Sequence, residues 1–238
     1  MAKRQIVNSY KEVLQELSIR MGKIVTPHDL FEVGLTQIKR IDNGSIRVRW
    51  KELVDSIQNP YSKIDISVRS HGRNGSGSND LLVILKKVFE KDFKIDSTNN
   101  AAPAQILRNA FNEEYQDYQI SHVFEERTNN PLLFTAPWMI CYTPKIIDPF
   151  TGHETKGFPE FKEEFIDWAF RANKVYIDEY NEIIFQYWKK LKSVLNTTTH
   201  DKKFKDHMVA VLAPIHKNAE KLSKTDRMNY YLTEFEKI

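Results

Sequence analysis

Histidine, asparagine and acidic residues gather in one central part of the sequence, between residues 118 and 157. The stretch YQISHVFEERTNNPLLF contains His122 and Asn130, and KIIDPFTGHETKG follows it with Asp148, His153 and Glu154. A neutral imidazole can take a proton from water near pH 7, and carboxylates bind hard cations such as Mg²⁺. Residues of these types in one segment predict metal-assisted hydrolysis with a histidine as the general base.

The same segment resembles the HNH, or His-Me finger, nucleases. Ser121, His122 and Val123 are similar to the Ser-His-Ile type triplet of the family's first strand, and WMICYTP, residues 138–144, is similar to its second strand. The resemblance implies that the protein is a metal-dependent endonuclease that hydrolyses double-stranded DNA, as a restriction or phage-type enzyme. It implies a bound Mg²⁺ or Mn²⁺ that stabilises the scissile phosphate.

The resemblance also assigns the individual residues of the expected site. His122 is the general base, and Asn130 replaces the orienting asparagine, because Trp138 and Met139 stand where the family has that asparagine. The remaining expected residues are Lys145 in the catalytic set and Asp148, His153 and Glu154 as metal ligands.

A second nuclease pattern overlaps the first. Glu154-x-Lys156 after Asp148 is similar to the Asp…Glu-x-Lys site of the restriction-enzyme-like superfamily. A gap of six residues that contains Pro149 and Gly152 is too short for the usual two-strand arrangement. The histidine-centred site is therefore preferred.

Other histidines lack the spacing of metal ligands. His207 and His216 are nine residues apart, and His28 and His200 have no histidine three or four residues away. His71 lies in SHGRNGSGSND, residues 70–80, which is either a flexible linker or a loop that orders on a phosphate backbone. Motifs of metalloproteases, α/β-hydrolases and dinucleotide enzymes are absent.

Arginines on two expected strands and nearby loops are the candidate DNA contacts. SIRVRW, residues 45–50, and KIDISVRS, residues 63–70, both alternate apolar and polar residues, which predicts two half-buried strands. Alternate positions on one strand share a face, so their arginines are expected to form one basic surface. The candidates are Arg47, Arg49, Arg69, Arg73 and Arg127.

Amphipathic helices are expected on both sides of the central segment. Periodic patterns predict helices over residues 9–25, 26–41, 51–59, 80–93, 102–118, 159–195, 202–222 and 225–238. The pattern at 159–195 carries an aromatic stripe typical of core packing. Strands are expected at 119–124 and 137–144. The expected fold is α+β and helix-rich, with a nucleic-acid recognition region at 1–100 and a catalytic-like region at 101–238.

Composition limits the class of protein. The 238 residues carry a net charge of +3 and a single cysteine, Cys141, so an intramolecular disulfide is excluded. No apolar run approaches the length of a membrane span, and a cytoplasmic protein is expected. The competing interpretation is a non-catalytic DNA-binding or protein-interaction module with a degenerate nuclease-like core. A homodimer would suit an enzyme that cuts both strands.

Overall fold

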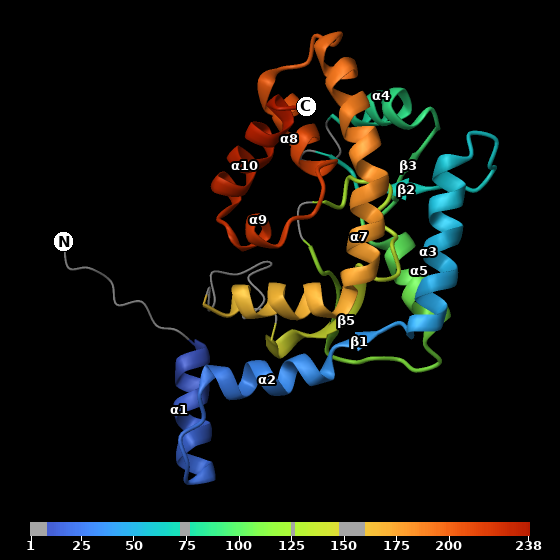
Figure 1. Cartoon of the computed structure of the whole chain (residues 1–238). Helices are drawn as coiled ribbons and strands as arrows, with labels where there is room; N and C mark the ends of the chain where they lie inside the picture. Colours follow the sequence, from blue (N-terminus) through green and yellow to red (C-terminus); the bar gives the residue numbers. More distant parts are fainter. Residues whose placement is uncertain (1–8, 72–76, 125–126, 148–159) are drawn as a thin grey trace.

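Helices dominate the architecture, and two small sheets lie among them (Figure 1). The computed structural model of the chain describes residues 9–71, 77–124, 127–147 and 160–238. The helices are α1 (Ser9–Met21), α2 (Pro27–Gln37), α3 (Asn43–Gln58), α4 (Ser78–Phe89), α5 (Ala101–Ala110), α7 (Glu160–Asn196), α8 (Lys202–Val211), α9 (Lys217–Lys221) and α10 (Lys224–Glu236), with a short 3₁₀ helix, η2 (Lys145–Ile147). This arrangement confirms the expected helix-rich α+β fold.

The larger sheet has the strand order β1-β5-β4, and all its pairs are antiparallel. Its strands are β1 (Lys39–Arg40), β4 (Tyr118–His122) and β5 (Ile140–Pro144). His122 is opposite Ile140 and Tyr118 is opposite Pro144, so the two central strands expected from the sequence are present and pair along their whole length. The smaller sheet is one parallel pair, β2 (Ser67–Val68) with β3 (Lys94–Ile95).

The expected strand at residues 45–50 is wrong, because these residues lie in α3. Ile46 and Trp50 are one helical turn apart and are 0% and 3% exposed, whereas Val48 points outward and is 58% exposed. The side chain of Asp42 caps the helix by accepting a hydrogen bond from Ser45 N at 2.9 Å. Asp42, Asn43 and Gly44 therefore form the cap and first residues of α3 and not a turn between elements, and tertiary packing selects the helical spacing.

The predicted start of α2 is confirmed. Thr26 Oγ1 accepts a hydrogen bond from Asp29 N, Asp29 in turn accepts from Thr26 N, and Pro27 occupies the first helical position. Gly34 of the same helix lies so close to Ile147 that an added Cβ would be 1.9 Å from Ile147 Cγ2. The absence of a side chain at residue 34 therefore allows α2 to pack on η2.

Helix α7 is the central support of the fold, and it changes direction after its gold first part (Figure 1). Asn173 is buried within it, and its Nδ2 donates to Ala169 O at 3.0 Å, four residues earlier. Arg40 adds a hydrogen bond to Ala172 O at 3.3 Å and another to the side chain of Asn173. Side-chain donors that engage helix carbonyls are a common cause of such bends.

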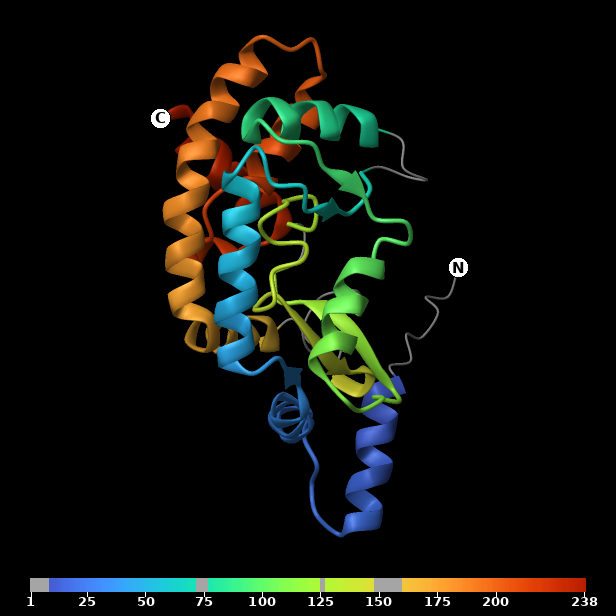
Figure 2. The same ribbon diagram turned by 90° about the vertical axis from the view of Figure 1, so that its right-hand side faces the viewer.

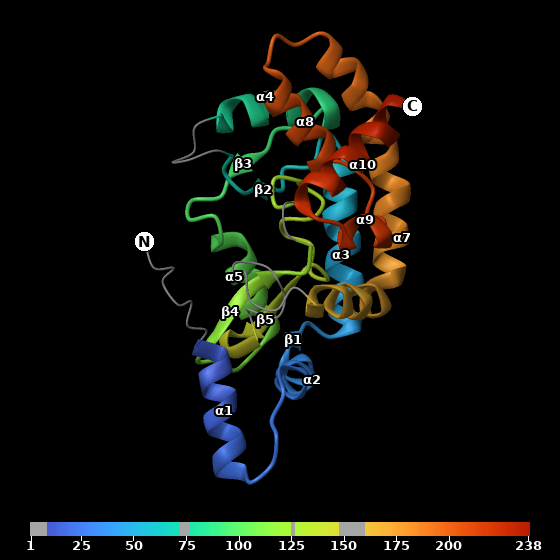
Figure 3. The same ribbon diagram turned by 90° about the vertical axis from the view of Figure 1, so that its left-hand side faces the viewer.

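Figure 2 shows α3 beside α7, and Figure 3 shows α8, α9 and α10 gathered in front of α7. Trp50 of α3 donates its Nε1–H to Glu179 of α7 at 2.8 Å.

The main apolar core contains residues from both sides of the expected division at residue 100, including Leu85, Trp138 and Ile184. Among the described helices, none is long and apolar enough to cross a membrane.

Candidate functional site

The imidazole of His122 lies in the interior of the protein. The residue is only 8% exposed, its Nε2–H donates to the carbonyl O of Phe134 at 2.9 Å, and its ring stacks on the Phe134 ring at a centroid distance of 5.6 Å. Burial lowers the pKa of His122 to about 4, although the Phe134 carbonyl favours the protonated form. This histidine is neutral at pH 7, but it faces hydrocarbon and a backbone carbonyl and does not face an open pocket.

Asn130 and Arg127 connect the central loop to the C-terminal helices. Asn130 is fully buried, and its Nδ2 donates at 2.9 Å to both Tyr180 Oη and Val211 O. Arg127 donates to Glu220 Oε1 at 2.7 Å and to Pro214 O at 3.3 Å. Neither side chain is available to orient a catalytic histidine or to contact a phosphate at the surface, so these two assignments are corrected.

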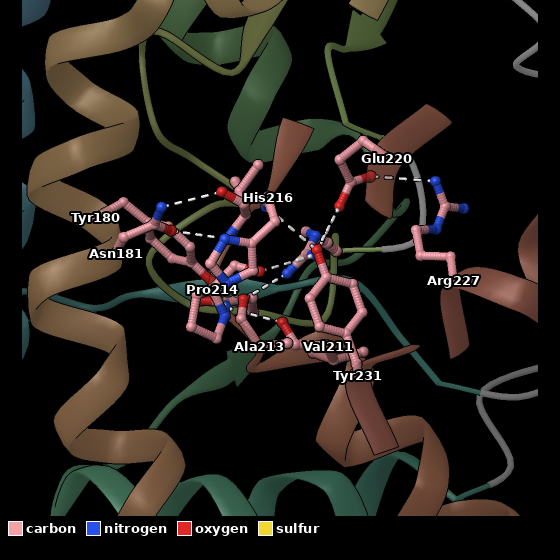
Figure 4. Close-up of polar contacts among 12 residues, drawn as sticks. Tyr180, Asn181, Val211, Ala213, Pro214, His216, Glu220, Arg227 and Tyr231 are labelled. Carbon is pink, nitrogen blue, oxygen red and sulfur yellow. Dashed lines mark hydrogen bonds and ion pairs between the residues drawn. The ribbon is translucent and has the colours of Figure 1, made fainter. Parts of the chain in front are cut away.

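Glu220 is the centre of this buried polar network (Figure 4). Its carboxylate accepts hydrogen bonds from Arg127, from Arg227 Nη1 at 3.1 Å and from Tyr231 Oη at 3.1 Å. Burial by itself would raise the pKa of Glu220, but the two guanidinium groups outweigh it and lower the pKa. The network therefore keeps its charges, and it fixes the central loop against α9 and α10.

Lys145, the remaining residue of the expected nuclease site that the structure describes, is not brought to His122. Lys145 is exposed and lies 3.7 Å from the carboxylate of Asp117. The expected metal ligands Asp148, His153 and Glu154 lie outside the described residues. Among the residues that the structure describes, no group of three or more histidine, cysteine or acidic side chains is arranged to hold a metal ion.

The candidate DNA-binding arginines do not share one face. Arg47 and Arg49 are two residues apart on a helix, so their side chains point about 200° apart around α3. Arg47 borders the groove between α3 and α7, whereas Arg49 borders the cleft between α3 and α5. Arg69 is exposed just beyond β2, and Arg73 lies outside the described residues. The expected common surface of Arg47 and Arg49 is wrong because it rested on a strand.

Three histidines from distant parts of the sequence meet in a different cavity, which we call the histidine pocket. The ring centroids of His71 and His207 are 4.4 Å apart, and Phe204 contacts both His71, at 5.4 Å, and His200, at 4.8 Å. The cavity has a volume of about 580 Å³. Its lining residues are His71, Gly77, Asp80, Thr199, His200, Asp201, Lys203, Phe204 and His207.

Hydrogen bonds between the end of β2 and the start of α4 fix His71 in this pocket. Ser78 Oγ accepts from His71 N at 3.1 Å and donates to His71 O at 3.3 Å. Asn99 Oδ1 accepts from the backbone N–H of Ser70 at 2.9 Å. Gly77 has φ +80°, and an added Cβ would lie 3.1 Å from His71 Cδ2. A glycine at residue 77 therefore provides both the left-handed turn and the space for the imidazole.

Asn129 connects the central loop to the histidine pocket and determines the tautomer of His207. Its Nδ2 donates to Arg69 O at 2.6 Å and to Ser70 O at 3.3 Å, which fixes the orientation of the amide. Asn129 Oδ1, 3.2 Å from His207 Nε2, is then the acceptor. Neutral His207 must carry its proton on Nε2 and its lone pair on Nδ1.

The pocket combines helix N-termini with ionisable side chains. Gly77 precedes α4 without a side-chain cap, and Asp201 begins α8 by accepting from Phe204 N at 2.7 Å. Uncapped N–H groups and the helix dipole favour a bound anion, and Lys203 adds a positive charge. Asp80 adds a negative charge 3.6 Å from His200 Nε2, a distance at which the interaction is electrostatic and not a hydrogen bond.

The pKa of His71 favours the neutral form of its imidazole. Burial lowers it below 6.5, although contact with Asn129 opposes this effect. His71 is therefore neutral at pH 7 and able to accept a proton, and a second imidazole lies beside it. Such a pair can take a proton from one oxygen of a substrate and give a proton to another.

Sequence reasoning missed this pocket because it searched for close spacing along the chain. His200 and His207 lie about 130 residues after His71, and only the packing of α8 against the turn before α4 brings them together. One signal was present, since the sequence of residues 70–80 combines a histidine with glycines. It gave no indication of a partner.

Comparison with known proteins gives a matching family model and a similar bacterial protein. A family model described as "Uncharacterised protein PM1201" matches residues 41–238. A protein of Pasteurella multocida (strain Pm70), "Uncharacterized protein PM1201", is 36% identical over 161 residues, which cover 64% of this chain and 71% of the relative. No solved structure matches the chain.

Proposed function

The chain belongs to the Uncharacterised protein PM1201 family, and we propose that it is a nuclease whose proton transfers take place in the histidine pocket. The observation that carries the proposal is the pair of imidazoles of His71 and His207, 4.4 Å apart in an open cavity of about 580 Å³. Lys203 and the N-terminus of α4 are suitable partners for a phosphate in the same cavity. The site thus combines an anion-binding element with a base and an acid.

We propose RNA as the substrate, because its own 2′-hydroxyl supplies the nucleophile and these side chains can then catalyse cleavage without a metal ion. In the proposed reaction one histidine, neutral at the start, takes the proton of the 2′-hydroxyl, and the 2′-oxygen attacks phosphorus. The bond from phosphorus to the 5′-oxygen breaks, and the other histidine, protonated at the start, gives its proton to the leaving 5′-oxygen. Lys203 stabilises the charge on the non-bridging oxygens. The products are a 2′,3′-cyclic phosphate and a 5′-hydroxyl.

Metal-dependent cleavage of double-stranded DNA is the second candidate. The observation that favours it is the antiparallel β4–β5 pair with His122 at the end of its first strand, because this is the strand pair that the HNH resemblance requires. Mg²⁺ or Mn²⁺ would act there as a Lewis acid on the phosphate, and a homodimer would cut both strands. The expected ligands lie outside the described residues, and the burial of His122 opposes its role as base.

A cleavage assay with a metal series separates the two candidates. End-labelled single-stranded RNA and supercoiled plasmid DNA are incubated with the purified full chain in EDTA, Mg²⁺ or Mn²⁺. We expect cleavage of RNA in EDTA, and we expect His71→Ala and His207→Ala each to slow it by roughly 10²–10⁴-fold.

The matched control is His28→Ala, since His28 is half-exposed on α2 and outside the pocket. Its rate should equal that of the wild type, and thermal melting should show that all three variants are folded. Cleavage of DNA only with a divalent cation, unaffected by the pocket variants, would favour the second candidate. If neither RNA nor DNA is cleaved under any condition, the interpretation as a non-catalytic binding module is favoured.

A further inference from the structure

A second cavity, of about 360 Å³, lies between α3 and α5 and reaches Ser67 of β2. Residues from both helices, from the chain entering β2 and from the central loop line it. They are Arg49, Glu52, Leu53, Ser56, Ile64, Asp65, Ile66, Ser67, Ala102, Gln105, Ile106, Thr135 and Pro137. We propose that this α3–α5 cleft binds an extended peptide, which adds as a strand to the free edge of β2.

The edge of β2 is open where it borders the cleft. Ile66 O accepts from Lys94 N and Val68 O accepts from Asp96 N, each at 2.9 Å, so these two residues face β3. Successive residues of a strand direct their backbone groups to opposite edges. The N–H and C=O of Ser67 therefore point away from β3, and no residue in the described ranges forms a hydrogen bond with them.

The central loop explains why this edge is open. Arg69 N, on the same edge as Ser67, donates to Thr128 O at 3.0 Å. Farther along the loop, Thr135 and Pro137 line the cleft and form no backbone hydrogen bond with this edge. A donor and an acceptor on one strand residue are matched by one residue of an extended chain, and main-chain hydrogen bonds of this kind attach peptides to sheet edges.

The walls of the cleft are suited to apolar side chains. Leu53 on α3, Ile106 on α5 and Pro137 on the loop form them, and Ile64 at the rim is 60% exposed. A strand paired with Ser67 presents alternate side chains to one face. We therefore expect the bound peptide to carry apolar residues at alternate positions.

Charges of both signs border the apolar walls. Arg49 and Glu52 are three residues apart on α3, and Asp65 is paired with Lys94 at the side of the cleft. Such a rim favours a peptide with little net charge. A helical peptide is not the expected occupant, because its own backbone hydrogen bonds leave it no groups to pair with Ser67.

The test uses a phage-displayed library of random twelve-residue peptides, selected on the immobilised full chain. We expect enrichment of peptides with alternate apolar residues that bind with micromolar affinity. Ser67→Pro should weaken binding at least about tenfold, because proline removes the outward N–H and leaves the pairs of Ile66 and Val68 with β3 in place. Ala102→Trp should also abolish binding by filling the cleft.

Val83→Trp is the matched control, because Val83 is exposed on α4 and does not line the cleft. It should bind the selected peptides like the wild type, and thermal melting should show that every variant is folded. Failure to enrich any peptide, or equal binding by Ser67→Pro and Ala102→Trp, would overturn the proposal. So would a bound peptide that is helical by transferred nuclear Overhauser effects. None of these outcomes depends on nuclease activity.

Discussion

The burial of His122 predicts a specific dependence of stability on pH. Its pKa is about 4 in the folded protein, against an ordinary value of 6.5. Between these values the unfolded chain binds more protons than the folded one, so stability falls as the pH decreases from 6.5 toward 4. From pH 7.5 to pH 5 this one group should lower the free energy of unfolding by about 2 kcal/mol.

The replacement His122→Gln isolates this effect. Glutamine can donate to Phe134 O but does not titrate, so the variant should lose about 2 kcal/mol less than the wild type over the same pH range. Urea denaturation at pH 7.5, 6 and 5 measures both proteins, and other titrating groups cancel in the comparison. The Cε1–H resonance of His122 should show no titration above pH 5. Identical pH dependence in the two proteins, or titration of His122 near pH 6.5, would refute the burial of its imidazole.

Three further predictions concern the buried network and the histidine pocket. Arg127→Leu leaves Glu220 with one guanidinium and should lower the free energy of unfolding by about 3–5 kcal/mol, or Tm by roughly 6–10 °C. Adding Glu220→Leu should recover part of this loss. A decrease below about 1 kcal/mol for Arg127→Leu would contradict the network. The folded-state pKa of Glu220 is lowered, so the stability that its carboxylate contributes should be present above pH 4.5 and lost as the pH falls further. Urea denaturation should show that Glu220→Gln lacks this pH-dependent part of the stability of the wild type. Gly77→Ala should slow RNA cleavage at least about tenfold, because it strains the turn and displaces His71; an unchanged rate would contradict the placement of that ring.

Local sequence patterns predicted those helices and strands in which the spacing of the apolar residues matches the face that the fold buries. The strands that became β4 and β5, the capped start of α2 and the long helix α7 all follow from residues close together in the sequence. Residues 45–50 show the limit of this reasoning. Ile46, Val48 and Trp50 alternate as in a strand, yet Ile46 and Trp50 are also four residues apart and fit one face of a helix.

The candidate site was harder to predict because its residues are distant in sequence. His122 and Asn130 are close together in the sequence and were expected to share an open site, but the fold buries them against Phe134 and Tyr180. His71 and His207, in contrast, become neighbours only when α8 packs beside the turn before α4. The helix-rich fold was therefore visible in the sequence, whereas the position of the chemistry depended on tertiary contacts.

The chemical identity of the RNA ends tests the central proposal most directly. After incubation in EDTA, mass spectrometry of the fragments should find 2′,3′-cyclic phosphate and 5′-hydroxyl ends for the wild type. The same ends should be missing for His71→Ala and His207→Ala. Fragments with 3′-hydroxyl and 5′-phosphate ends that form only with a divalent cation, or fragments unchanged in the two variants, would contradict proton transfer in the histidine pocket.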